Sequence, residues 1–118
     1  MLANMLISKQ MNWSITYYNE KVRREVLAMP AGIVADYVRL TDAMTLHGAD
    51  LRMSHARAMG SGLFELRPKG PEGIGRVFYG TQVGRTIVVL HSFVKKTQAT
   101  PDVELRLARK RLKDVQHG

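Results

Sequence analysis

The chain has 118 residues, of which 18 are Lys or Arg and 10 are Asp or Glu, giving a formal net charge of +8 and an isoelectric point near 10.2. This length suits one domain and is too short for two, and a hydrophobic share of 45% is ordinary for a globular protein with a single core. The sequence contains no cysteine, which excludes disulfides, thiolate zinc sites and cysteine nucleophiles.

The positive charge is the feature of the composition that bears most on function. A domain this basic attracts polyanions, and nucleic acid is the first candidate; a basic surface without such a role is the alternative. The longest apolar stretch, residues 86–90, is far too short to span a membrane, and residues 1–7 lack the basic start of a signal peptide. We therefore expect a cytoplasmic protein that does not contact membranes, with one domain over residues 1–118 and a flexible extension at residues 1–11.

The N-terminal part predicts a strand followed by two helices. Residues 13–18 alternate apolar and polar side chains, which is the period of a half-buried strand. Asn19 is a suitable N-cap for a helix over residues 20–28, and Pro30 suits the first turn of a second helix that ends near residue 46. The predicted buried faces of these helices consist of Val22, Val26 and Met29, and of Ile33, Tyr37, Leu40 and Met44.

A β pattern begins at residue 63, after residues 49–62, which carry no clear periodicity. Strands are predicted over residues 63–67, 75–80 and 86–94, and turn-forming residues separate them. The last of these strands is apolar on both faces, which indicates a position in the middle of a sheet.

The C-terminal part predicts a helix that begins after Thr100, a natural N-cap, with Pro101 in its first turn. Its apolar stripe consists of Leu105, Ala108, Leu112 and Val115, and its other side carries Arg106, Arg109, Lys110 and Lys113. The order β-α-α-β-β-β-α indicates an α+β fold, a small antiparallel sheet with the two N-terminal helices packed on one face. The other face of the sheet is then open to solvent or to a ligand.

Strand alternation sorts the polar side chains by face. Glu65 and Arg67 share the face opposite the large apolar residues of their strand, and Arg76 points to the same open side. His91 shares a face with Lys95, and the pattern leaves open whether that face or the face of Lys96 is the open one. Several cations on an exposed sheet form a plausible phosphate site, because Arg supplies forked donors and Lys a point charge. The candidate cluster consists of Glu65, Arg67, Arg76, His91, Lys95 and Lys96.

Each member of this cluster has a structural alternative. Glu65 and Arg67 are equally explained as a cross-strand ion pair, which for Glu65 is the favoured interpretation, and His91 as a half-buried structural histidine. Lys95 and Lys96 are also typical of solvated charges at a sheet edge. The basic side of the last helix is interpreted as a solvated face or as a contact with ribosomal RNA.

A family resemblance rests on the strand sequences. Leu63-Phe64-Glu65-Leu66-Arg67, Gly75-Arg76-Val77-Phe78-Tyr79 and the stretch from Val89 to Thr97, followed by Thr100-Pro101 and a basic helix, resemble the phage-derived HigB-like branch of the RelE/ParE toxin superfamily. The similarity covers nearly the whole chain from about residue 12. It implies an antiparallel sheet packed on two N-terminal helices and the toxin role of a type II toxin–antitoxin pair.

The resemblance also implies a target and partners. Toxins of the RelE and HigB kind cut messenger RNA in the ribosomal A site and are neutralised by an antitoxin. Here we expect the antitoxin to be a helix-turn-helix DNA-binding protein. We expect the toxin to contact DNA only indirectly, through this antitoxin. By position, Arg76 matches the arginine of the third strand, Lys95 or Lys96 the basic residue after the last strand, and Arg67 the end of the second strand. Some relatives have a tyrosine or a histidine near the C-terminus that could transfer a proton. Here the last helix has no tyrosine and His117 lies at the end of the chain, so the general base is unassigned. Residues expected to contact RNA are Arg57, Lys69, Arg109, Lys110 and Lys113.

The sequence thus predicts a ribosome-dependent mRNA endoribonuclease that needs no cofactor. Arg67 and Arg76 would stabilise the charge on phosphorus, His91 is the first choice for proton transfer and Glu65 the reserve. No His, Asp and Glu cluster has the spacing of metal ligands, so no metal is expected. The alternatives are a ParE-type DNA gyrase poison with the same fold, a non-catalytic nucleic-acid-binding module and an inactive toxin remnant.

Overall fold

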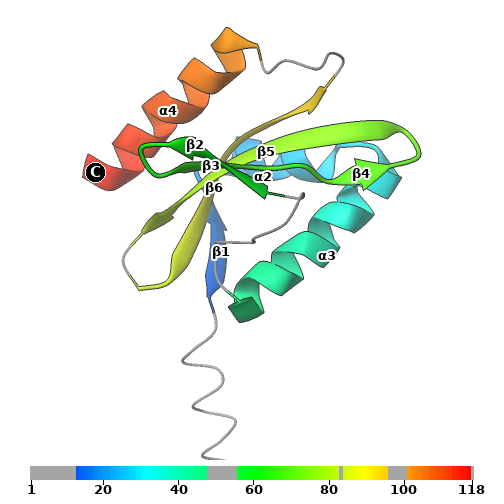
Figure 1. Cartoon of the computed structure of the whole chain (residues 1–118), viewed down its shortest axis with the longest axis horizontal. Coiled ribbons are helices and arrows are strands. Elements are labelled where there is room, and N and C mark those ends of the chain that lie inside the picture. The colour runs from blue at the N-terminus through cyan, green and yellow to red at the C-terminus, as the bar shows by residue number, and fades with distance from the viewer. Residues whose placement is uncertain (1–12, 48–55, 83, 96–100, 118) are drawn as a thin grey trace, which may run out of the picture.

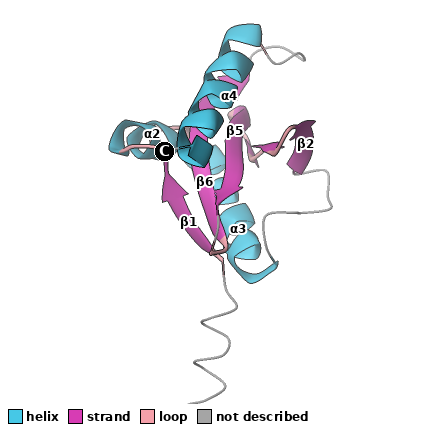
Figure 2. Cartoon of the chain, turned by 90° about the vertical axis from the view of Figure 1, so that its left-hand side faces the viewer, coloured by secondary structure: helices cyan, strands magenta, loops and turns pink. Residues whose placement is uncertain are grey.

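A twisted β-sheet runs through the molecule and carries helices on both of its faces (Figures 1 and 2). The computed structural model describes residues 13–47, 56–82, 84–95 and 101–117. In chain order the elements are β1 (Ser14–Tyr17), α2 (Glu20–Leu27), α3 (Ala31–His47), β2 (Ala56–Gly60), β3 (Leu63–Leu66), β4 (Lys69–Gly70), β5 (Gly73–Gln82), β6 (Thr86–Lys95) and α4 (Asp102–His117). No helix in these residues is long and apolar enough to cross a membrane.

The N-terminal helices form close to their predicted positions. The Asn19 side chain accepts a hydrogen bond from the Val22 backbone N–H at 2.8 Å, which caps α2 as expected. The apolar stripes of α2 and α3 are buried against one face of the sheet, together with Leu66, Val77 and Tyr79. The placement of the two N-terminal helices on one face is therefore confirmed.

The sheet differs from the prediction in two ways. Its strand order is β1-β6-β5-β3-β2, with β4 paired to β5, and β1 runs parallel to β6 whereas the other pairs are antiparallel. The predicted order therefore lacks β2 and β4, and the expectation of a purely antiparallel sheet is wrong for β1. The β2 sequence has no apolar alternation; it becomes a strand because the turn at residues 60–62, with positive φ throughout, folds it back onto β3.

The face opposite α2 and α3 is not open along its length, and this corrects a second expectation. Helix α4 lies across it (Figure 2), and Ala108 and Leu112 are buried there against Phe78, Val88 and Leu90. The physical reason lies in β6, which is apolar on both faces and would expose its second apolar face without a cover. The predicted extension at residues 1–11 and Lys96 lie outside the described residues.

Candidate nucleic-acid interface

Cross-strand register gathers the predicted cations on the α4 side of the sheet. Paired residues on neighbouring strands project to the same face. One row runs from Arg57 on β2 through Glu65 and Phe78 to His91 on β6. Glu65, the acidic residue of the predicted cluster, therefore lies between Arg57 on one side and the rings of Phe78 and His91 on the other.

Two further rows lie beside it on the same face, since β5 residues alternate in side. Arg76 on β5 pairs with Phe93 on β6, and Arg67 follows β3 directly, two residues after Glu65. In the outermost row, Lys69 on β4 pairs with Ile74, which in turn pairs with Lys95. We call this set the cationic face; it consists of Arg57, Arg67, Lys69 and Arg76. The backbone of Lys95 is in register with the outermost row, and its side chain lies outside what the structure describes.

The centre of the cationic face is a buried ion pair. The Arg76 Nε atom lies 3.8 Å from Glu65 Oε2, and the two residues are only 4% and 1% exposed. Burial lowers the pKa of Arg76; Glu65 opposes this shift, and the positive charges of Arg67 and Arg57 add to it. Nε and Nη1 of Arg76 are buried and have no hydrogen-bond partner among the described residues. The prediction that these two side chains lie on an open surface is therefore wrong, although their shared face is correct.

His91 lies in an aromatic cluster at the α4 end of the face. Its ring centroid is 6.5 Å from that of Phe78 and 6.2 Å from that of Phe93. Its Nε2 shares a hydrogen bond with Glu104 Oε2 at 2.8 Å, so α4 fixes the orientation of the imidazole. Sequence reasoning did not identify Glu104 as a partner of His91, because nothing in a linear pattern pairs a helix residue with a strand residue.

The residues predicted to contact RNA divide into two groups. Arg57, Lys69, Lys110 and Lys113 are exposed. Arg109 is not a free surface cation, because its guanidinium donates to the carbonyl of Met59 at 2.7 Å and to that of Gly60 at 3.2 Å. It therefore ties α4 to the turn that follows β2.

Sequence reasoning also missed a second tether of α4. Arg111 donates to the Leu90 carbonyl at 2.8 Å and lies 5.0 Å from the ring centroid of Tyr18. The Tyr18 hydroxyl in turn donates to Asp114 at 2.8 Å, and this hydrogen bond is the main cause of the raised pKa of Tyr18. These contacts explain why α4 is held at a defined position against the edge of the cationic face.

A surface pocket of about 310 Å³ lies near the end of β6. It lies between the α2–α3 junction and β6, and its lining includes Glu25, Met29, Pro30 and Phe93. Another pocket, of about 370 Å³, lies between Thr81 and Gln116 and contains none of the predicted site residues. The first pocket contains none of them either, and its lining includes Phe93, which pairs with Arg76 in the sheet.

Comparisons with known proteins agree with this architecture. Residues 24–113 match the protein family described as phage-derived protein Gp49-like (DUF891). The fold is similar to that of a chain in the crystal structure of the archaeal RelE–RelB complex from Pyrococcus horikoshii OT3, with a TM-score of 0.53, 14% sequence identity and coverage of 75% of this chain and 100% of that chain. A search of curated protein sequences found no match. At this identity the structural similarity establishes a RelE-like fold, in agreement with the expected fold.

Proposed function

Because the chain belongs to the Gp49-like family of phage-derived proteins, we propose that it is the toxin of a type II toxin–antitoxin pair. More specifically, we propose a HigB-like member of the RelE/ParE superfamily that cuts messenger RNA on the ribosome. The observation that carries the proposal is the cationic face, in which Arg57, Arg67 and Arg76 lie on the same side of a RelE-like sheet as the buried carboxylate of Glu65. Two buried Arg76 donors have no hydrogen-bond partner among the described residues, which is costly, and an anionic phosphate oxygen is a group that would satisfy them.

The reaction we propose is attack of a ribose 2′-oxygen on the adjacent phosphorus. A base removes the 2′-hydroxyl proton, the new P–O bond closes a 2′,3′-cyclic phosphate, and the 5′-oxygen leaves with a proton from an acid. Negative charge builds on the phosphoryl oxygens in between, and Arg67 and Arg76 are the side chains suited to stabilise it. Lys95 or Lys96 would hold the phosphate or protonate the leaving oxygen.

His91 is the proton-transfer group of this proposal. An imidazole can both accept and donate a proton, and a 2.8 Å hydrogen bond to Glu104 orients the His91 ring. The Glu65 carboxylate lies 3.8 Å from Arg76 Nε, so we assign it the role of holding Arg76 rather than that of a base. Arg57, Lys69, Lys110 and Lys113 would contact RNA phosphates, and Arg109 would act mainly through its tether to β2.

The proposed partners follow from this role. They are the ribosome with its messenger RNA and a cognate antitoxin, for which a helix-turn-helix protein is our expectation. Contact with DNA would then be indirect, through the antitoxin, and the site of action would be the cytoplasm.

Cleavage of ribosome-bound messenger RNA by the purified protein, mapped by primer extension, tests the proposal. Arg67→Ala should reduce the cleavage rate by about 100- to 1,000-fold, the usual effect of removing a stabiliser of transition-state charge. Arg23→Ala is the matched control, because it removes the same charge from an exposed position on α2, where Arg23 pairs with Glu20 in the same helix. Intact messenger RNA with the unaltered protein, or an Arg67→Ala variant as active as the control, would refute the proposal; trapped gyrase–DNA complexes would instead support the gyrase-poison alternative.

A further inference from the structure

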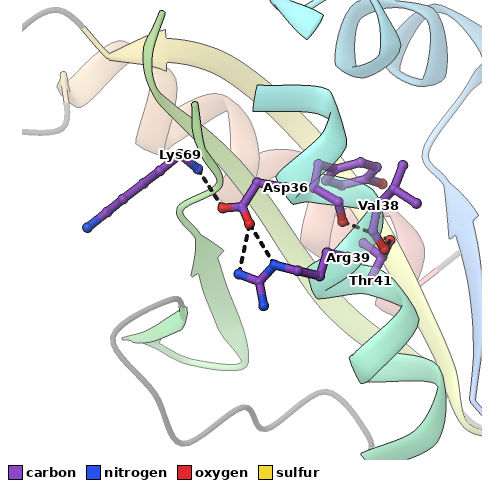
Figure 3. Close-up of polar contacts among 6 residues, drawn as sticks. Asp36, Val38, Arg39, Thr41 and Lys69 are labelled. Atoms are coloured by element: carbon purple, nitrogen blue, oxygen red, sulfur yellow. Dashed lines mark hydrogen bonds and ion pairs between the residues drawn. The ribbon is translucent and has the colours of Figure 1, made fainter. Parts of the chain in front are cut away.

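The short strand β4 is held by a carboxylate of a distant helix. Lys69 N–H donates to Asp36 Oδ2 on α3 at 2.7 Å, and the other oxygen of the same carboxylate accepts two hydrogen bonds from Arg39, at 2.7 and 2.9 Å (Figure 3). Asp36 is well covered, with a side-chain exposure of 16%, whereas Arg39 is 62% exposed. The carboxylate thus points inward to the backbone of β4 and is oriented from outside by Arg39.

A second carboxylate makes the reciprocal contact. Glu72, in the turn after β4, accepts a hydrogen bond from Gly32 N–H at 3.0 Å in the first turn of α3. That turn contains no acidic residue of its own, so Glu72 supplies the negative charge that a helix N-terminus favours. Helix and hairpin therefore hold each other through two carboxylate–backbone hydrogen bonds that run in opposite directions.

The backbones approach closely enough that only glycine fits at the contact. A Cβ atom on Gly70 would lie 2.5 Å from the carbonyl carbon of Gly32, and a Cβ atom on Gly32 would lie 2.5 Å from Pro71 Cδ. A two-residue strand has little hydrogen bonding of its own to fix it, and β4 pairs with β5 at only two positions. The contact with α3 therefore helps to define the position of β4.

This contact holds Lys69 in the outer row of the cationic face. Lys69 lies in register with Ile74 and Lys95, beside the row of Arg76, and its side chain extends away from α3 in Figure 3. A lysine on a freely moving loop would pay conformational entropy each time it bound a phosphate. An anchored backbone removes part of that cost.

We propose that Asp36 is a positioning residue for RNA binding, which acts through the backbone of Lys69. This inference rests on the proposed function, since it assumes that Lys69 contacts RNA. It makes a prediction opposite in sign to simple electrostatics. Removing a carboxylate from a protein that binds a polyanion should strengthen binding, whereas loss of a positioning contact should weaken it.

The test is a double-mutant cycle on the full chain, with Asp36→Ala and Lys69→Ala, alone and together. The readout is the dissociation constant for a short fluorescein-labelled single-stranded RNA, measured by anisotropy over a range of salt concentrations. Lys69→Ala should weaken binding several-fold and reduce the slope of log affinity against log salt by about 0.7, the value for one phosphate contact on a single strand. Asp36→Ala should also weaken binding several-fold, and it should have no effect in the Lys69→Ala background.

Two further variants separate positioning from folding and from net charge. Asp36→Asn keeps an oxygen that can accept from Lys69 N–H, so it should restore most of the affinity. Asp42→Ala removes the same charge from an exposed position on α3 and should leave affinity unchanged or slightly higher. Thermal unfolding of each variant shows whether the compared proteins are folded.

The outcomes distinguish this inference from the function on which it rests. If the unaltered chain binds RNA and Asp36→Ala either strengthens binding or costs the same with and without Lys69, the positioning role is refuted while the proposed function stands. If the unaltered chain has no affinity for RNA, both fail. Coupled losses that Asp36→Asn reverses are the result we expect.

Discussion

At the scale of single residues, the ion pair of Glu65 and Arg76 determines which substitutions the cationic face can accept without loss of stability. Both side chains are almost fully buried, so removing one charge leaves the other without compensation. We expect Glu65→Gln to lower the free energy of unfolding by about 3–5 kcal/mol, measured by urea denaturation. Unchanged stability would mean that the pair contributes nothing and that another group neutralises Arg76.

The double variant Glu65→Leu, Arg76→Met is the control for this prediction. Replacing both charges with apolar groups removes the desolvation cost together with the attraction, so it should recover most of the lost stability. It should not recover RNA cleavage, because the proposed charge stabiliser is absent. Recovery of both properties would show that Arg76 has only a structural role.

At the scale of elements, α4 determines how much of the sheet is covered. Leu112 is buried against Gly80 and the apolar side chains of Phe78 and Leu90, so Leu112→Ala should cost about 2–5 kcal/mol of unfolding free energy. Because the same helix carries Glu104, the variant should also raise hydrogen exchange around His91. Val103→Ala, on the exposed side of α4, should change stability by no more than about 0.5 kcal/mol. Equal effects of the two variants would contradict the packing described for α4.

The elements that sequence predicted correctly are those with a strong internal period. The buried stripes of α2, α3 and α4 follow from the spacing of Val22, Ile33 and Ala108 with their neighbours, and β6 is recognisable from its apolar run. Strands β2 and β4 exist because a turn or a distant helix holds them, and no local pattern records such a contact. Alternation correctly assigned Arg76 to a face, but it does not reveal that α4 and Glu65 cover that face.

At the scale of the whole molecule, affinity for ribosomes can depend on the total net charge or on where the cations lie. Lys110 and Lys113 are exposed on α4, on the side of the sheet that carries the cationic face, whereas Lys21 and Arg24 are exposed on α2, which packs on the opposite side. Changing either pair to Gln lowers the net charge by two. Net charge alone predicts equal losses of affinity for ribosomes, because long-range attraction depends on the total.

Local phosphate contacts predict unequal losses instead. Lys110→Gln with Lys113→Gln should weaken binding of the protein to ribosomes and reduce the salt slope by about 0.7 for each cation that contacts a single strand. Lys21→Gln with Arg24→Gln should leave the slope nearly unchanged, because α2 lies on the far side of the sheet from the proposed interface. Co-sedimentation with ribosomes at several salt concentrations measures both. Equal salt slopes for the two double variants would show that α4 is not part of the interface. The end of the sheet around Arg67 and Lys69 would then be the remaining contact surface.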